Sequence, residues 1–162
     1  MREIKFRIWD GNIGKMYSFQ RQFFIDNNGR LFFNADPYGI DMSGKLRIYR
    51  HPKENHFRIM QYTGLKDENG KEMYEGDVVK MNAHIDGDFE YGLAPEIDLD
   101  FIGEVAIIAS KGVCLKNARW EDNLVTSKHH RYGKCSSYKP IAAYRSSVIG
   151  NIYENRELLE AV

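Results

Sequence analysis

The sequence predicts a mostly β protein that ends in one short helix. Three observations predict this fold class: apolar and polar residues alternate in many short segments, aromatic and β-branched residues fill those segments, and glycine turns separate them. The chain has 162 residues, 43% of them hydrophobic and 13% aromatic, with no net charge. A chain of this length buries roughly two thirds of its unfolded surface, so it needs no disulfide framework.

The N-terminal segment predicts the first strand. Ile4, Phe6 and Ile8 alternate with Lys5 and Arg7, which places three apolar side chains on one face and two cations on the other. This alternation leaves no apolar core for a signal peptide, and no apolar run in the chain approaches the roughly 20 residues that span a bilayer. We therefore expect a cytoplasmic protein without a membrane segment.

The next two strands form a predicted hairpin. Residues 23–25 and 31–33 are aromatic and aliphatic, and they flank Asn28-Gly29, a pair that adopts the positive φ angles of a tight turn. Adjacent aromatics belong to opposite faces of a strand, so one aromatic face needs a cover. Either the rest of the chain or a second copy supplies it. Phe24 and Phe33 are the candidate self-association residues.

The remaining strands are predicted where β-branched and aromatic residues concentrate. These segments are 46–49, 58–62, 72–74, 77–81, 101–109, 113–117 and 144–153. Residues 155–162 are the predicted helix, because Asn155 can cap its first turn and Leu158, Leu159 and Val162 share one face. Residues 82–100 read as a loop-like excursion that contains two glycines, one proline and many acids.

Charge is segregated along the chain although the total is neutral. Between Met81 and Ser110 there are seven acids and no Lys or Arg, whereas residues 111–139 contain seven Lys and Arg against two acids. Two interpretations are open. The segments pair inside one fold or cover two solvated faces, or they direct head-to-tail self-association or form a basic binding face.

The sequence contains partial matches to phosphate-binding and metal-binding motifs, but no complete one. Gly64, Gly70 and Lys71 resemble a phosphate-binding loop, but five residues separate the glycines and Glu72 stands where a hydroxyl is needed, so a hairpin turn at Asn69-Gly70 is predicted instead. The weak candidates for oxygen and zinc ligands are Asp86, Asp88, Asp98, Asp100, Cys114, His129, His130 and Cys135. Their spacing matches no metal motif, so we predict no metal site and no cofactor.

Catalytic centres are not identifiable from the sequence. No serine lies in a nucleophile elbow, and Cys114 lies between Val113 and Leu115 as a small buried apolar residue would. Glu75 and Asp77 are a pair of acids around Gly76, which is also ordinary turn composition. We therefore predict that the protein is not an enzyme.

One cluster of cations and aromatics suggests nucleic-acid binding. Small β-barrels bind nucleic acid through aromatic residues that lie among cations. The candidate contacts are Lys128, His130, Arg131, Tyr132, Lys134 and Lys139, with His129 and Tyr138 between them. The neutral total charge argues against this function, and a solvated basic loop explains the same composition.

Three segments together resemble the YopX family of small phage- and prophage-encoded proteins. They are FRIWD at 6–10 followed by Lys15-Met16-Tyr17, MQYTGLKDENGKEMYEGDVV at 60–79, and VIGNIYEN at 148–155. Between 82 and 144 only Gly103-Glu104-Val105 matches the family. The resemblance implies a mostly β fold with a small C-terminal barrel, which we expect to be SH3-like, and a phage or prophage origin. It implies no reaction, cofactor or catalytic residue.

The resemblance and the strand pattern together suggest the domain organisation. We expect an N-terminal β region over 1–62, a barrel-like β region over 63–154 with the acidic excursion at 82–100, and a short helix over 155–162. The signature turn residues are Gly64, Gly70, Glu75, Gly76 and Asp77. Glycine permits sharp bends there, and the acids around Gly76 can accept backbone hydrogen bonds.

These observations favour a non-enzymatic phage accessory protein. We expect a β-rich module that forms a homo-oligomer and binds an unidentified host or phage protein. The alternative is a small nucleic-acid-binding β-barrel that uses the cluster at 128–139. A metal-dependent enzyme centred on the acidic segment is a third, weaker interpretation.

Overall fold

The prediction of a mostly β fold with a short C-terminal helix is confirmed in a computed structural model of the chain. The model describes residues 3–18, 23–25, 31–34, 48–50, 56–85, 97–122 and 132–160, and only the backbone within 23–50. The chain divides into two compact units, an N-terminal unit of residues 5–60 and a C-terminal unit of residues 61–162 with residues 1–4. Within the described residues no helix is long and apolar enough to cross a membrane.

The N-terminal unit begins with an antiparallel strand pair. β1 (Phe6–Asp10) pairs with β2 (Lys15–Ser18), and Gly14 between them has a φ of 64°. Ile8 is fully buried, as its position in the alternating pattern predicts. Ile4 differs from the prediction, because it precedes the strand and its side chain is 74% exposed.

A second sheet of this unit contains the predicted aromatic hairpin. β3 (Phe23–Ile25), β4 (Leu31–Asn34) and β5 (Ile48–Arg50) form a three-stranded antiparallel sheet in that order. Phe23 pairs with Phe33, and Phe24 pairs with Phe32. The pairing of residues 23–25 with 31–33 is therefore confirmed, and the predicted turn at Asn28-Gly29 lies outside the described residues.

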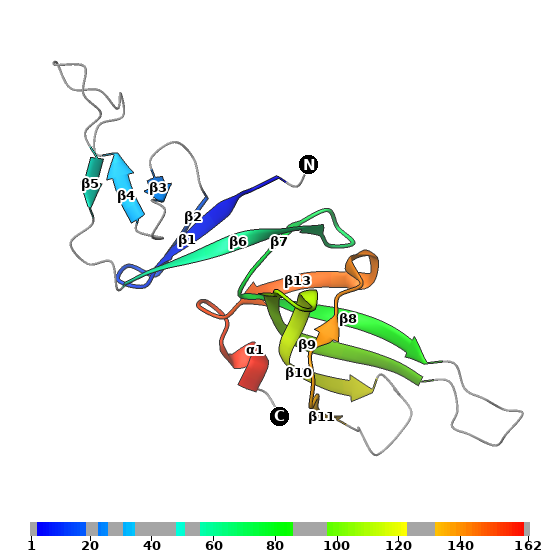
Figure 1. The fold of residues 1–162 in the computed structure, drawn as a ribbon. Helices are drawn as coiled ribbons and strands as arrows, with labels where there is room; N and C mark the ends of the chain where they lie inside the picture. The colour runs from blue at the N-terminus through cyan, green and yellow to red at the C-terminus, as the bar shows by residue number, and fades with distance from the viewer. Residues whose placement is uncertain are drawn as a thin grey trace, which may run out of the picture. The chain divides into compact units, whose positions relative to one another are not determined.

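The C-terminal unit is built on a curled antiparallel sheet (Figure 1). Its strands lie in the order β11-β10-β9-β8-β13, and β12 also pairs with β10, so the barrel-like region is a half-barrel. The bounds are β8 (Asp77–Ile85), β9 (Ile97–Ile108), β10 (Gly112–Asp122), β11 (Tyr132–Lys134), β12 (Lys139–Pro140) and β13 (Ser146–Asn151). A short 3-10 helix, η2 (Ala143–Arg145), precedes β13.

Two further strands, which precede this sheet along the chain, form a hairpin. β6 (Phe57–Lys66) begins in the N-terminal unit and ends in the C-terminal unit, where it pairs with β7 (Glu72–Tyr74). The predicted turn at Asn69-Gly70 is confirmed, because Gly70 has a φ of 79° and its N–H donates to the Asp67 carbonyl at 2.9 Å.

The prediction of a loop-like acidic excursion over residues 82–100 is wrong at both ends of this range. Asn82 pairs with Asp100, His84 with Asp98, and Ile85 with Ile97, so β8 and β9 continue as a long hairpin. Apolar residues at 83, 85, 97 and 99 alternate with polar ones, which is the pattern of a strand with one buried face. The acid content of the segment masked this pattern, and residues 86–96 lie outside the described part.

The core of the C-terminal unit lies against the curled sheet. Its buried side chains are Met73, Val79, Met81, Val105, Leu115 and Ala118, from β7, β8, β9 and β10. The only α-helix in the described part, α1 (Glu157–Glu160), packs on β9 and β10. The predicted helix at 155–162 is therefore present but shorter, and residues 161–162 lie outside the description.

Candidate functional site

The first half of the family-like signature forms the β6–β7 hairpin, and Asp67 organises its turn. Asp67 Oδ1 accepts hydrogen bonds from the N–H groups of Asn69 at 2.9 Å and Lys71 at 2.8 Å. Its Oδ2 accepts one from the Val148 N–H at 3.0 Å. One carboxylate therefore joins this turn to β13, which contains the closing segment of the signature.

Gly64 differs from its predicted place at a turn. It lies inside β6, where the pairing with β7 shifts register between Tyr62 and Lys66, and its φ is 85°. Thr63 beside it is buried, and its Oγ1 donates to the Met73 carbonyl at 2.9 Å and accepts from the Leu65 N–H at 3.2 Å. The glycine therefore serves an irregularity of the β-bulge type, in which β6 has two more residues than β7 between the paired positions.

Glu75, Gly76 and Asp77 form the turn between β7 and β8. Gly76 has a φ of 79°, its N–H donates to the Val105 carbonyl at 2.9 Å, and its own carbonyl accepts from the Ile152 N–H at 2.9 Å. Asp77 is 1% exposed, and its Oδ2 accepts from the Tyr74 N–H at 2.7 Å. Buried and bonded in this way, Asp77 holds the turn and offers no surface to a substrate.

Two acids of the acidic segment pair with cations inside the C-terminal unit, one of them with a cation of the basic segment. Lys116 Nζ lies 2.8 Å from Glu104 Oε1 across the β9–β10 hairpin. This partner raises the pKa of Lys116, as a side-chain hydrogen bond to Glu104 favours the charged ammonium. Asp100, which is buried, lies 2.6 Å from Lys80 Nζ. These acids therefore neutralise cations within the same sheet.

The candidate metal ligands are dispersed in the structure. Asp98 is exposed and lies 2.8 Å from His84 Nδ1, while Asp100 is bound to Lys80. Cys114 and Cys135 are free thiols, and burial raises the pKa of Cys135. Among the described residues no three His, Cys, Asp or Glu side chains are grouped to hold a metal ion. Asp86, Asp88, His129 and His130 lie outside the description.

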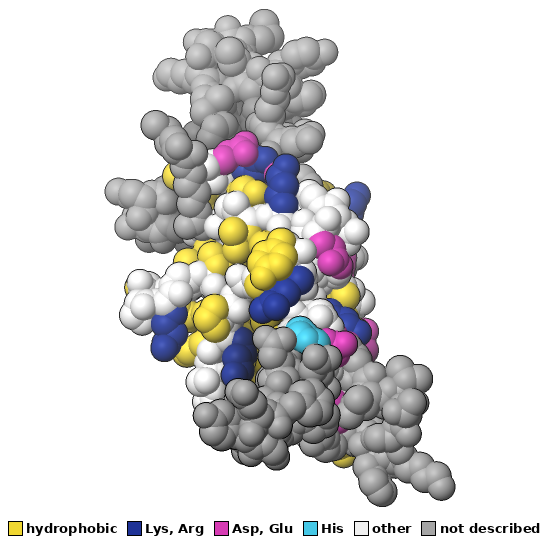
Figure 2. Space-filling view, turned by 90° about the vertical axis from the view of Figure 1, so that its right-hand side faces the viewer, with side chains coloured by type: hydrophobic (Ala, Val, Ile, Leu, Met, Phe, Trp, Pro, Cys, Tyr) yellow, Lys and Arg dark blue, Asp and Glu magenta, His cyan; other side chains and the backbone are white. Residues whose placement is uncertain are grey.

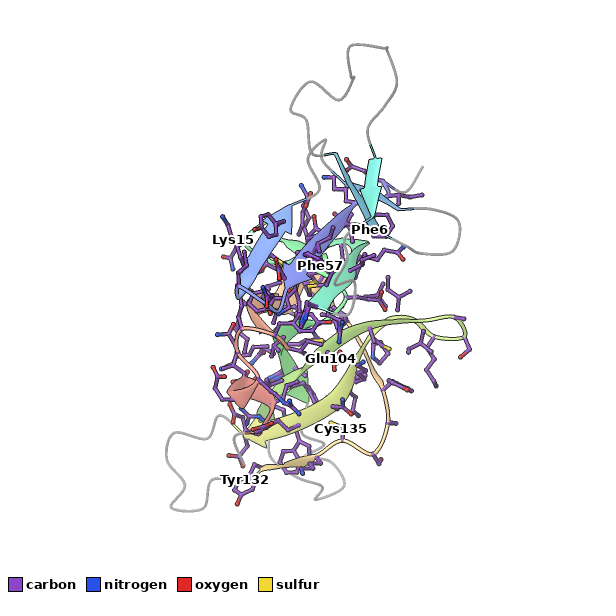
Figure 3. The ribbon with its side chains drawn as sticks, turned by 90° about the vertical axis from the view of Figure 1, so that its left-hand side faces the viewer. Phe6, Lys15, Phe57, Glu104, Tyr132 and Cys135 are labelled. Carbon is purple, nitrogen blue, oxygen red and sulfur yellow. The ribbon has the colours of Figure 1, made fainter. Side chains whose placement is uncertain are left out.

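The predicted nucleic-acid cluster is described only in part. Lys128, His130 and Arg131 lie outside the described residues, while Tyr132 and Lys134 are exposed on β11 and Lys139 is half-buried on β12. Tyr132 and Cys135 come from the segment around β11, and Glu104 comes from β9 (Figure 3).

Several cations of this unit lie over aromatic rings. The Lys111 Nζ is 5.9 Å from the Tyr138 ring centroid, Lys139 Nζ is 5.4 Å from that of Phe101, and Arg145 Cζ is 5.6 Å from that of Tyr144. Tyr144 is 77% exposed. We call Lys111, Tyr138, Lys139, Tyr144 and Arg145 the cation–aromatic set. Figure 2 shows one face of the molecule where apolar side chains lie among Lys and Arg.

The self-association candidates Phe24 and Phe33 lie in different rows of the β3–β5 sheet. Phe33 pairs with Phe23 on one side and with Tyr49 on the other, which makes a row of three aromatic residues. Phe32, the partner of Phe24, pairs with Arg50. Because successive residues of a strand belong to opposite faces, Phe24 and Phe33 belong to opposite faces of this sheet.

Comparison with known proteins identifies the family. The family described as YopX protein matches residues 5–160, nearly the whole chain. The chain belongs to the YopX family. A crystal structure of protein EF1440 from Enterococcus faecalis is similar, with 25% sequence identity, a TM-score of 0.51, and coverage of 98% of this chain and 99% of that one. No curated protein matches the chain.

Two features of this YopX family member were missed in the sequence. Tyr144 and Arg145 fell within a predicted strand, whereas they lie in η2, which turns the Tyr144 side chain toward solvent. A pocket is lined by Asn117, Ala118, Arg119, Lys134, Cys135, Leu159 and Glu160. No local motif marks it, because its residues come from β10, the β11 segment and α1.

Proposed function

We propose that this protein is a non-enzymatic phage or prophage accessory module that self-associates and binds a host or phage protein in the cytoplasm of a bacterial cell. Membership of the YopX family supports the phage or prophage origin, since the sequence segments that resemble this family are those of phage- and prophage-encoded proteins. The observation that carries self-association is the aromatic row formed by Phe23, Phe33 and Tyr49.

The size of the β3–β5 sheet is the physical reason for this proposal. Its strands have three, four and three residues, and a sheet this small buries little apolar area by itself. By register, Phe23, Phe33 and Tyr49 share one face and Phe24 and Phe32 share the other, so each face needs a cover. Aromatic residues are enriched in the centres of protein interfaces, and a second copy offers the same row as a self-complementary partner.

Charge segregation does not support the proposal. Glu104 pairs with Lys116, and Asp100 pairs with Lys80, all within one C-terminal unit. These groups are therefore not available to orient a second copy. Self-association is attributed to the N-terminal aromatic row alone.

The molecular mass of the full chain in solution tests the proposal. Gel filtration coupled to light scattering is run across the micromolar range. The proposal predicts a mass of at least two chains. A mass of one chain at every concentration refutes it.

A second candidate function, nucleic-acid binding, is favoured by a specific observation about charge. In the part of the chain that the structure describes, Lys111, Lys139 and Arg145 form no ion pair, and each lies over an aromatic ring. Three cations of the same unit outside this set, Lys80, Lys116 and Arg119, are paired with acids. Two of these rings, Tyr138 and Tyr144, are exposed, and exposed aromatics beside unpaired cations suit stacked bases and phosphates.

Electrophoretic mobility shift tests this second function with single- and double-stranded DNA and RNA at two salt concentrations. Binding through phosphates must weaken as salt rises, and Arg145→Gln should lower the slope of log affinity against log salt by about 1. Arg156→Gln is the matched control, because Arg156 is exposed, is paired with Glu160 and lies outside the cation–aromatic set. Absence of any shift at low salt would remove this function.

A further inference from the structure

The pocket between β10, the β11 segment and α1 has a volume of about 440 Å³, large enough for a small organic molecule. Ala118 and Leu159 give it apolar walls, and Asn117, Arg119 and Lys134 contribute polar groups. All of its residues belong to the C-terminal unit.

The backbone beneath the pocket is held in an unusual conformation. Asn117 has a φ of 51°, the only positive φ of a residue other than glycine in the described part of the chain. It lies where the β9–β10 register shifts between Lys116 and Arg119. The N–H of Cys135 donates to the Ala118 carbonyl at 2.7 Å and so fixes the β11 segment to this bulge. Bulges and positive φ angles of this kind are over-represented next to binding sites.

Arg119 contributes a guanidinium group to the pocket wall. Its side chain is 12% exposed, and its Nη1 donates to Glu121 Oε2 at 2.8 Å. Its Nε is buried and has no hydrogen-bond acceptor within the described residues. Buried polar groups in folded proteins nearly always have a partner, so this guanidinium has hydrogen-bonding capacity that its contacts in the described residues leave unused.

The charges around the pocket favour an anionic acceptor. The two nearby carboxylates are engaged, since Glu121 binds Arg119 and Glu160 lies 3.1 Å from Arg156 Nε. Lys134 has no ion-pair partner in the described part and lines the same pocket. An acidic group placed here receives one charge-assisted bond from a lysine and one from a guanidinium.

We propose that this pocket binds a small molecule that carries a carboxylate or phosphate group. The acidic group lies between Arg119 and Lys134, and the apolar part of the ligand lies against Ala118 and Leu159. This binding site is independent of the proposed self-association, because it lies in the other unit of the chain.

The test measures binding of defined probes to the full chain by thermal shift and isothermal titration. The probes are phenyl phosphate and benzoate, with phenol as the uncharged control, all at one ionic strength. The proposal predicts that at least one of the two acids binds saturably and stabilises the protein. Phenol should neither bind nor stabilise it. The probe that binds more tightly shows whether the site prefers a phosphate or a carboxylate group.

Two lysine variants show whether binding occurs in this pocket. Lys134→Gln should weaken the binding about tenfold, whereas Lys66→Gln, which removes an exposed cation of the same unit outside the pocket, should leave it unchanged. Arg119→Gln should abolish binding. If this variant fails to fold, the comparison of the two lysine variants still tests whether the ligand binds in the pocket. Failure of both acids to bind, equal stabilisation by phenol, or unchanged affinity in Lys134→Gln would overturn the proposal.

Discussion

Asp67 shows how one residue joins distant parts of the YopX fold. Its carboxylate accepts three backbone hydrogen bonds, two within its own turn and one from Val148 in β13. In Asp67→Asn an amide nitrogen replaces one oxygen, so a donor faces at least one N–H donor. We expect the variant to lose about 1–3 kcal/mol of unfolding free energy at neutral pH, measured by urea denaturation.

The same residue predicts a pH dependence. Burial raises the pKa of Asp67, but the N–H groups of Val148, Lys71 and Asn69 outweigh burial and hold this pKa below its ordinary value of 3.8. The ionised carboxylate therefore stabilises the fold above that value, and its contribution is lost as pH falls through the lower folded pKa. The stability difference between wild type and Asp67→Asn should shrink below about pH 4.

The control for this experiment is Glu157→Gln, which changes an exposed carboxylate in the first turn of α1. Its stability difference from wild type should be small at neutral pH. An Asp67→Asn variant as stable as wild type at neutral pH, or a difference that persists unchanged in acid, would contradict the role given to this carboxylate.

The sequence predicts the role of a residue correctly where that role depends on its neighbours in the chain. The Asn69-Gly70 turn was predictable because positive φ angles are a property of those two residues. The role of Asp67 was not, since Val148 is 81 residues away along the chain. The pocket at Arg119 could not be predicted from the sequence for the same reason, because the residues that line it come from three separate elements.

At the scale of elements, the contact between β9 and β10 depends on Gly103. A Cβ atom at this position would lie 3.0 Å from the Cβ atoms of Leu115 and Ala118 and 3.1 Å from the Ala118 Cα, which belongs to the backbone. Gly103→Ala should therefore lower the unfolding free energy by about 1–3 kcal/mol through overpacking. The reduced entropy of the unfolded chain offsets about 0.4–1 kcal/mol of this, so net destabilisation is expected.

A double variant separates this explanation from a general effect of alanine. Ala118→Gly removes one of the clashing Cβ atoms, so Gly103→Ala should cost less in the Ala118→Gly background than in wild type. Urea denaturation of the four proteins gives the coupling energy. Additive effects would show that the two positions do not contact each other.

The elements also show why strand boundaries were harder to predict than strands. The alternation from Ile97 to Asp100 continues β9, but its acids suggested a loop. Gly64 suggested a turn, yet β6 passes through it by a bulge whose hydrogen bonds Thr63 completes. In both cases pairing with a neighbouring strand overrode local composition.

At the scale of the whole molecule, the fold class followed from period-two patterning, and the sheet order did not. Placement of β13 beside β8 joins residues about 70 positions apart, which no local pattern specifies. The segregation of charge along the chain left both internal pairing and a role in assembly open, and the β9–β10 hairpin brings Glu104 and Lys116 together inside one unit. Long-range strand pairing therefore decides what the charges do.

We propose that the aromatic row of the β3–β5 sheet holds two or more copies of the chain together. Phe33 lies in the row with Phe23 and Tyr49, while the row of Phe24 continues to Arg50 on the opposite face. The sequence predicts both Phe24 and Phe33 at the interface, but the two lie on opposite faces of this sheet, and we propose that the face of Phe33 forms the interface. Phe33→Asp should therefore place a charge in the interface, and Phe24→Asp is the matched control that adds the same charge on the other face.

The most direct test is the mass of these three proteins, measured side by side by gel filtration with light scattering. We expect a mass of at least two chains for wild type and for Phe24→Asp, and a mass of one chain for a folded Phe33→Asp. Far-ultraviolet circular dichroism checks that both variants keep their strands. A wild-type mass of one chain throughout the micromolar range, or a Phe33→Asp mass equal to that of wild type, would contradict the proposal.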